Sequence, residues 1–205
     1  MDDSRELYDL ELIELCLESD RYQNIDEILK NGVQERSTYS LRVALTGFEP
    51  EYILSSAMLE RLSSSFDLVL VRQTLPMSEL MNRVRTVLIE PLTTFYTPVG
   101  WDDVIRTVKM KNRGRMAFGT GKAPIGNGMK AMEDAIADLE DQGFAPSEAT
   151  GLVFLIRQPS VGLPLALVKA VVTRLRNTNK HCATVQSMPY DGADDMIEVD
   201  ILVAR

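Results

Sequence analysis

The stretch Arg115-Met-Ala-Phe-Gly-Thr-Gly121 is followed by a glycine-containing loop and then by a helical pattern from about Asn127 to Glu140. Small residues between an apolar strand and a helix are typical of a strand-to-helix turn, because glycine lets the backbone turn tightly. We therefore predict a structural glycine turn that is made by Gly119, Gly121, Gly126 and Gly128.

Strand-like and helix-like segments alternate along the rest of the chain. The run Leu152-Val-Phe-Leu-Ile156 is apolar throughout, which indicates a central strand that is covered on both faces. Asp191-Gly192 lies between the last two strands, where hairpin turns favour this pair. Strands are predicted at 41–47, 66–71, 115–118, 151–157, 182–188 and 196–204, and helices at 49–62, 78–89, 102–111, 127–141 and 163–177. This order predicts an α/β (α+β layered) fold, with a central β-sheet packed by helices.

The first 36 residues are acidic and carry apolar residues at helical spacing. Asn24 can cap a second short helix at 25–30. One helical face is formed by Leu7, Leu10, Ile13 and Leu17. We predict an acidic helical arm at 1–36, which packs on its own domain or binds a partner, and a single α/β domain at 37–205.

Composition limits the class of protein. The 205 residues are 45% hydrophobic and 25% charged, as in an ordinary soluble domain. No apolar run approaches about 18 residues, so we expect no membrane span. The acidic N-terminus lacks the features of a signal peptide, which favours a cytoplasmic protein. The net charge of -8 weighs against a nucleic-acid partner.

The residues that could carry metal or redox chemistry are few and scattered. Cys16 and Cys182 lie far apart, and the single histidine, His181, does not complete a zinc site. We therefore predict no metal and no cofactor. A local cluster of cations indicates either a patch for an acidic partner or a solvated helix end; it contains Arg106, Lys109, Lys111, Arg113 and Arg115.

Several motifs from about Ser78 to Arg205, taken in order, resemble the C-terminal domain of FtsZ, the bacterial tubulin homologue. Trp101-Asp-Asp-Val104 with Arg106-Thr-Val108 is similar to the Phe-Ala-Asp-Val-Arg-Thr-Val of that family. Met116-Ala-Phe-Gly-Thr-Gly121 is similar to its Met-Met-Gly-Ser-Gly, and Lys130-Ala131 to its Arg-Ala. The resemblance implies an FtsZ/tubulin C-terminal-domain-like sheet, with an extra N-terminal strand-helix-strand and the helical arm.

The resemblance also implies an interaction loop. In that family the loop before Phe-Ala-Asp-Val enters the nucleotide pocket of the next subunit, where acidic residues help to position the attacking water. Here Asp103 matches the second aspartate, whereas Gly100 and Pro98 stand where the family has an aspartate and an asparagine. The catalytic set is therefore incomplete, and we expect a binding role for Pro98, Gly100, Trp101, Asp102 and Asp103.

Some of these residues also have a purely structural interpretation. Trp101 is either an exposed contact anchor or a core residue under the loop. Asp102 and Asp103 can each serve as a helix cap.

The nucleotide-binding loop of the family, Gly-Gly-Gly-Thr-Gly-Thr-Gly, does not occur in the sequence. Gly119-Thr-Gly-Lys122 is no substitute, because a P-loop requires serine or threonine after the lysine and Ala123 stands there. We therefore expect no GTPase activity.

Two functions remain open on these grounds. The first is a non-enzymatic FtsZ/tubulin-like protein in cell division, which binds or modulates an FtsZ-like or tubulin-like filament or assembles with itself. The alternative is a stand-alone α/β module, unrelated to cell division, that binds a small ligand or forms a homo-oligomer.

Overall fold

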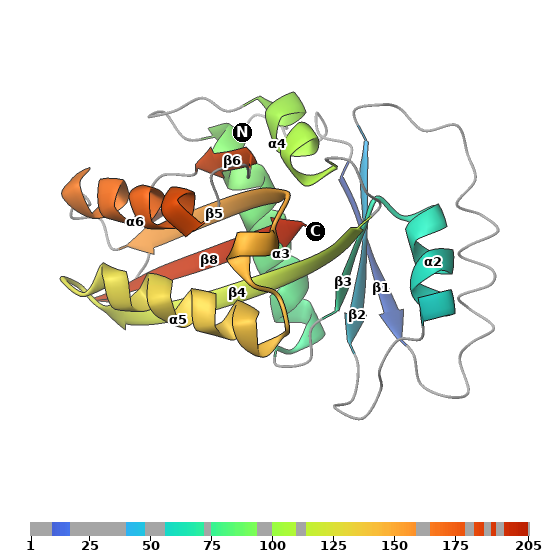
Figure 1. The fold of residues 1–205 in the computed structure, drawn as a ribbon, viewed down its shortest axis with the longest axis horizontal. Helices are drawn as coiled ribbons and strands as arrows, with labels where there is room; N and C mark the ends of the chain where they lie inside the picture. Colours follow the sequence, from blue (N-terminus) through green and yellow to red (C-terminus); the bar gives the residue numbers. More distant parts are fainter. Residues whose placement is uncertain are drawn as a thin grey trace.

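The computed structural model describes residues 10–16, 40–47, 56–71, 75–93, 100–109, 114–158, 165–178, 183–186, 190–191 and 195–204. These residues form one mixed eight-stranded sheet with helices on both faces (Figure 1). The predicted α/β fold, a central sheet packed by helices, is confirmed.

The strands are β1 (Leu10–Cys16), β2 (Leu41–Gly47), β3 (Leu68–Val71), β4 (Gly114–Pro124), β5 (Gly151–Gln158), β6 (Ala183–Gln186), β7 (Tyr190–Asp191) and β8 (Met196–Ala204). The helices are α2 (Ser56–Ser65), α3 (Met77–Thr93), α4 (Trp101–Val108), α5 (Gly128–Asp141) and α6 (Leu165–Thr178), with a short 3-10 helix, η2 (Pro146–Glu148). The six strands and five helices predicted after residue 36 are all present, with shifted ends.

The order of strands across the sheet is β1-β2-β3-β4-β8-β5-β6, and β7 pairs with the end of β5. Strands β1 to β4 run parallel, and β8 lies antiparallel between β4 and β5. The segment from β2 to β3 therefore extends the main sheet and does not form a separate layer.

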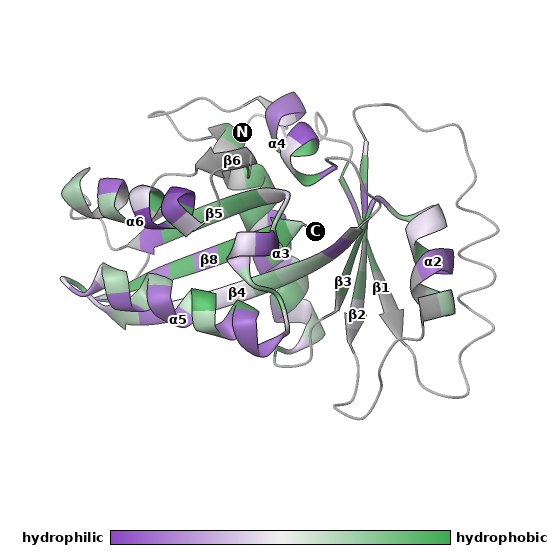
Figure 2. Cartoon of the chain, in the orientation of Figure 1, coloured by the Kyte–Doolittle hydropathy of each residue, from purple (hydrophilic) through white to green (hydrophobic). Residues whose placement is uncertain are grey.

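Two cores lie on opposite faces of this sheet. On one face, apolar side chains of α3 and α4, such as Leu80, Val84 and Val104, pack against β2, β3, β4, β5 and β8. On the other face, α5 and α6 cover β4, β8 and β5 through residues such as Ala135 and Leu175. Figure 2 shows hydrophobic residues along β5 and β8 and hydrophilic residues along the helices.

The prediction of a turn at Gly119 and Gly121 is wrong, because both residues lie inside β4. A Cβ atom at Gly119 would stand 2.3 Å from the carbonyl oxygen of Ala135, and one at Gly121 would stand 1.9 Å from that of Ala131. These glycines are therefore needed for the close approach of α5 to β4. The turn itself is made by Gly126, which has a φ of 94°, and Gly128 is the buried first residue of α5.

The prediction of a helix across the N-terminal arm is wrong for Leu10–Cys16, which forms β1. The segment satisfies both periods: Leu10 and Ile13 fit a helix, but Leu10 and Leu12 also alternate with Glu11. Pairing with β2 decides between them, and Leu10 and Leu12 pack against the core as neighbouring positions on one strand face. The rest of the arm lies outside the described residues.

Two smaller predictions about element ends are also wrong. The helix predicted at 78–89 ends too early, since α3 continues through Pro91 to Thr93 and Leu92 packs against the same core as Leu88. Asp191 is not part of a hairpin, because Tyr190–Asp191 pairs with β5, and β5 lies between β6 and β8.

Substitution of Gly121 by alanine tests the close approach of α5. We expect Gly121→Ala to lower the free energy of unfolding by about 1–3 kcal/mol, because α5 must move away from β4. The matched change Gly100→Ala should cost less than about 1 kcal/mol, since its Cβ would be 3.5 Å from its nearest neighbour. Urea unfolding measures both, and equal losses would contradict the packing argument.

Candidate functional site

The predicted interaction residues lie at the N-terminal end of α4. The buried side of this helix is formed by Val104, Ile105, Thr107 and Val108. The helix rests directly on the start of β5, where a Cβ atom at Gly151 would stand 1.8 Å from the carbonyl oxygen of Thr107. The sheet therefore holds α4 rigidly and fixes which residues its first turn presents.

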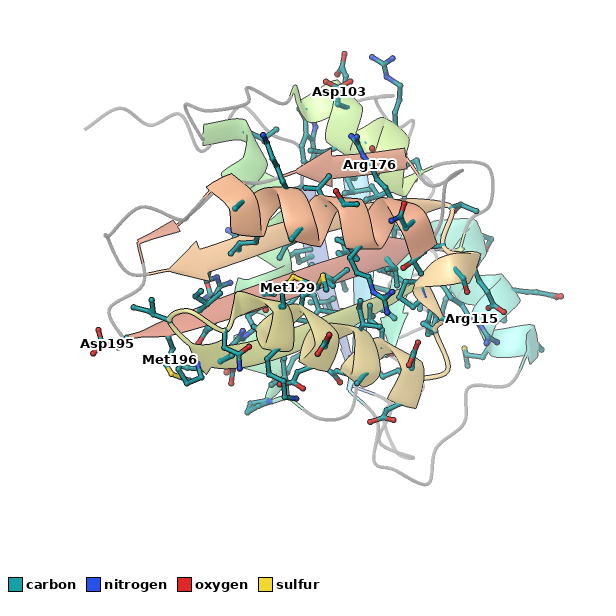
Figure 3. The ribbon with its side chains drawn as sticks, turned by 60° about the vertical axis from the view of Figure 1, so that its left-hand side comes forward. Asp103, Arg115, Met129, Arg176, Asp195 and Met196 are labelled. Atoms are coloured by element: carbon teal, nitrogen blue, oxygen red, sulfur yellow. The ribbon has the colours of Figure 1, made fainter. Side chains whose placement is uncertain are left out.

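The first turn of α4 presents two carboxylates to solvent. Gly100, Asp102 and Asp103 are exposed, and the Asp103 carboxylate accepts a hydrogen bond of 3.3 Å from the Gly100 amide. Figure 3 shows Asp103 projecting from the end of the molecule. Negative charge is favourable at a helix N-terminus. The structure brings Gly100 to Asp103 together, and Pro98 lies outside the described residues.

Trp101 has an intermediate exposure and packs against the core on the α3 side of the sheet. It anchors the start of α4 and leaves part of its ring at the surface. The two interpretations of Trp101 therefore both apply in part. Because Trp101 contributes to the core, Asp102 is a better residue with which to probe this surface.

The basic residues around 106–115 that the structure describes do not form one free patch. Arg106 lies 4.0 Å from Asp103, and the Lys109 ammonium lies 3.4 Å from Asp67 at the start of β3. Arg115 is exposed on β4, whereas Lys111 and Arg113 lie outside the described residues.

A second polar feature, which was not predicted from the sequence, lies between α3 and the sheet. Asp200 in β8 is fully buried. One of its oxygens accepts hydrogen bonds from Arg83 of α3 at 3.0 Å and from Thr120 of β4 at 2.8 Å. Its other oxygen lies 2.8 Å from a guanidinium nitrogen of Arg157 in β5. Three strands and one helix therefore meet at a single carboxylate.

Glu198 extends this ionic cluster toward solvent. It forms an ion pair of 2.9 Å with Lys122 and lies 3.7 Å from both Arg83 and Arg157. Glu79, one turn before Arg83 on α3, accepts a hydrogen bond of 2.9 Å from the Arg83 guanidinium. The cluster thus contains three cations and three carboxylates, so its charges balance.

The pKa values of the two carboxylates of β8 are shifted in opposite directions. It raises the pKa of Asp200, and the charges of Arg157 and Arg83 and the Thr120 hydroxyl oppose that rise. Burial also acts to raise the pKa of Glu198, but the hydrogen bond from Lys122 and the three nearby cations outweigh it and lower that pKa.

The sequence did carry a signal for this cluster. Glu198 and Asp200 interrupt the apolar run of β8 on one face, and Arg157 ends the apolar run of β5. The sequence does not reveal that β8 lies between β4 and β5. In the observed register, Asp200 of β8 stands opposite Thr120 of β4 on one side and opposite Leu155 of β5 on the other.

The cluster has the character of a structural link. The acids are matched by cations, and a perturbed pKa by itself also occurs in structural ion networks. Among the residues that the structure describes, no group of three or more histidine, cysteine, aspartate or glutamate side chains could hold a metal ion. In the same part of the chain, no helix is long and apolar enough to cross a membrane.

Removal of Asp200 tests the link. We expect Asp200→Ala to lower the free energy of unfolding by about 3–5 kcal/mol, because it leaves two guanidinium groups in a buried site without their shared anion. Asp134→Ala, which breaks an exposed pair with Lys130, should cost at most about 1 kcal/mol. Urea unfolding at pH 7 compares them, and a loss below about 1 kcal/mol at Asp200 would reject the link.

The lowered pKa of Glu198 makes part of the stability depend on pH. Its contribution is present above the pKa of unfolded glutamate, about 4.3, and is lost as the pH falls through the lower folded pKa. The loss of stability caused by Lys122→Met should therefore be largest near pH 7 and should shrink in acid. Unfolding free energies across this range measure it, with exposed Arg85→Gln as the control, and a constant difference would contradict the assignment.

Comparisons with known proteins show which folds this architecture resembles. No protein-family model and no curated protein matches the sequence. Solved structures do match. An empty FtsZ dimer from M. jannaschii has 16% identity and a TM-score of 0.66, and the match covers 96% of this chain and 63% of that chain. The GTPgS-bound protofilament of CetZ2 from Haloferax volcanii has 13% identity and a TM-score of 0.61, with 96% and 66% covered.

A third match is the GDP-form protofilament of TubZ from Bacillus thuringiensis serovar israelensis, with 11% identity, a TM-score of 0.57, and 96% and 61% covered. The chain thus spans less than two thirds of the length of these proteins. The sequence motifs placed the resemblance in residues 78–205 only. The structural likeness is wider and extends over nearly the whole chain. At these identities it concerns the fold, and this chain has an FtsZ/tubulin-like fold.

Proposed function

We propose that this chain is a non-enzymatic FtsZ/tubulin-like protein that binds an FtsZ-like filament protein through the N-terminal end of α4 and modulates its assembly. The observation that carries the proposal is the first turn of α4, which holds Gly100, Asp102 and Asp103 exposed on a helix whose other side is buried. A rigid, charged surface of this kind loses little conformational freedom when it binds.

The neighbours in fold support an assembly role. Their structures are described as a dimer and as protofilaments. Contacts between unlike surfaces of successive subunits generate open filaments. A chain that supplies one such surface without its counterpart would bind at a filament end and stop further addition there.

The geometry of β4 supports the absence of nucleotide chemistry at Gly119–Gly121. Gly119 pairs with Ile201 and Gly121 with Val199 in the ladder with β8. The space above both glycines is filled by the backbone of α5. A phosphate cradle needs backbone amides that converge on an open space, and we propose that this chain hydrolyses no GTP.

The experiment is a titration of this chain into the full-length FtsZ-like protein of the same organism, with GTPase rate and light scattering as readouts. We expect a dose-dependent change. Asp102→Lys should raise the concentration needed for half the effect about tenfold or more, because it reverses a charge at the contact while Asp103 still caps the helix. The control Glu60→Lys makes the same change of charge on exposed α2 and should behave as wild type.

Each contrary result rejects a defined part of the proposal. No effect at stoichiometric excess would reject binding to the filament protein. A full effect with Asp102→Lys would place the contact elsewhere, and GTP hydrolysis by this chain alone would reject its non-enzymatic character.

A further inference from the structure

The helices α5 and α6 form a layer with separated charge. They lie side by side over one face of the sheet (Figures 1 and 3). The sequence of α5 contains five acidic residues and one lysine, whereas that of α6 contains three basic residues and no acidic one. The layer therefore presents an acidic helix next to a basic helix.

Four outward charges of this layer have no partner among the residues that the structure describes. Glu133 and Glu140 on α5, and Lys169 and Arg176 on α6, are all exposed. Within the part of the chain that the structure describes, none of these four side chains forms an ion pair or a hydrogen bond. Opposite charges on neighbouring helices thus remain unpaired, since both sets point away from the sheet.

The two sets have the same spacing. Glu133 and Glu140 are seven residues apart, as are Lys169 and Arg176, and seven residues correspond to about 10 Å along a helix. On the same stripe, the exposed residue between the two charges is small, Ala137 on α5 and Thr173 on α6, whereas Ala170 and Arg174 are also exposed on α6 beside that stripe. Each helix therefore carries a charge near each end of one stripe and a small residue between them.

The topology fixes the relative direction of the helices. Both β4 and β5 are antiparallel to β8, so they are parallel to each other, and β6 is parallel to β5. The two crossover helices, α5 and α6, consequently run in the same direction. Figure 3 shows the two helices side by side over a similar stretch of the sheet, with Arg176 labelled on α6. Both helices also contact η2.

We propose that this face binds a second copy of the chain in a symmetric dimer. A two-fold axis that runs parallel to the helices and between them places α5 of each copy on α6 of the other. Glu133 then lies opposite Lys169 of the second copy, and Glu140 lies opposite Arg176 of that copy. Each contact occurs twice, as in any isologous interface.

The small residues make the close approach possible. Ala137 opposite Thr173 puts no long side chain at the centre of the stripe, and exposed Arg174 lies about 100° around α6 from Thr173, so the end charges can reach one another. The partner is a second copy because the acidic and basic stripes have matching length, spacing and direction within one chain. This surface lies on the opposite side of the sheet from α3, is separate from the first turn of α4, and is independent of the proposed function.

The experiment is a charge exchange followed by sedimentation velocity on the full chain. One variant reverses the basic stripe, Lys169→Glu with Arg176→Glu, and the other reverses the acidic stripe, Glu133→Lys with Glu140→Lys. The wild type should be a dimer that weakens as salt rises, because exposed charge pairs are screened. Each variant alone should have a dissociation constant at least about tenfold higher, since two like-charge contacts replace two attractive ones in each half.

An equimolar mixture of the two variants decides the matter, because each then offers the other a complementary stripe at both contacts. We expect the mixture to recover the dimer. The control Arg85→Glu with Arg115→Glu changes the net charge as much at exposed sites outside the layer and should dimerise as the wild type does. A wild type that stays monomeric at about 100 μM would overturn the proposal, since such an affinity is weaker than that of typical specific dimers. Dimers that persist in both variants, or a mixture that fails to associate, would overturn it as well.

Discussion

The double pairing of β4 is the constraint on which the rest of the structure depends. Its first residues pair in parallel with β3, and from Met116 to Pro124 it pairs antiparallel with β8. Met116 belongs to both ladders, opposite Leu70 on one side and Ala204 on the other. A strand of eleven residues thereby joins the parallel strands β1 to β3 to the mixed set of β8, β5 and β6, and one sheet results.

The two faces of β4 then determine what each side of the molecule can do. On one face, Gly119 and Gly121 leave room for the α5 backbone, and this close contact places the outer surface of α5 beside α6. On the other face, Thr120 and Lys122 point toward α3 and join the ionic cluster around Asp200 and Glu198. The alternation of side chains along one strand therefore separates the surface that we propose for dimerisation from the internal ionic cluster.

Sequence patterns predicted the elements whose signal is local and repeated. The buried strand Leu152–Ile156 and the helix of α5 were predicted because apolar runs and helical periodicity report burial directly. The residues of the first turn of α4 were predicted together as binding candidates, since they are contiguous in the sequence. The strand β1 was missed because its short segment fits two periods, and only pairing with β2 selects one. The roles of Gly119, Gly121 and Asp200 were missed because each depends on a partner that is distant in sequence.

The two groups of charges differ in a way that bears on function. In the cluster between α3 and the sheet, cations and carboxylates are already paired in charge, so a charged ligand would have to break existing ion pairs in a buried site at considerable cost. On α5 and α6, the side chains of Glu133, Glu140, Lys169 and Arg176 are exposed and form no pair with the described residues, so a complementary surface gains attraction without breaking internal pairs. Charge that is balanced and buried fixes the fold, whereas charge that is separated and exposed gives specificity and orientation to binding. By that reasoning, the surfaces that we propose for recognition lie on the outer helices, α4, α5 and α6, and the centre of the sheet provides the framework that holds them in place.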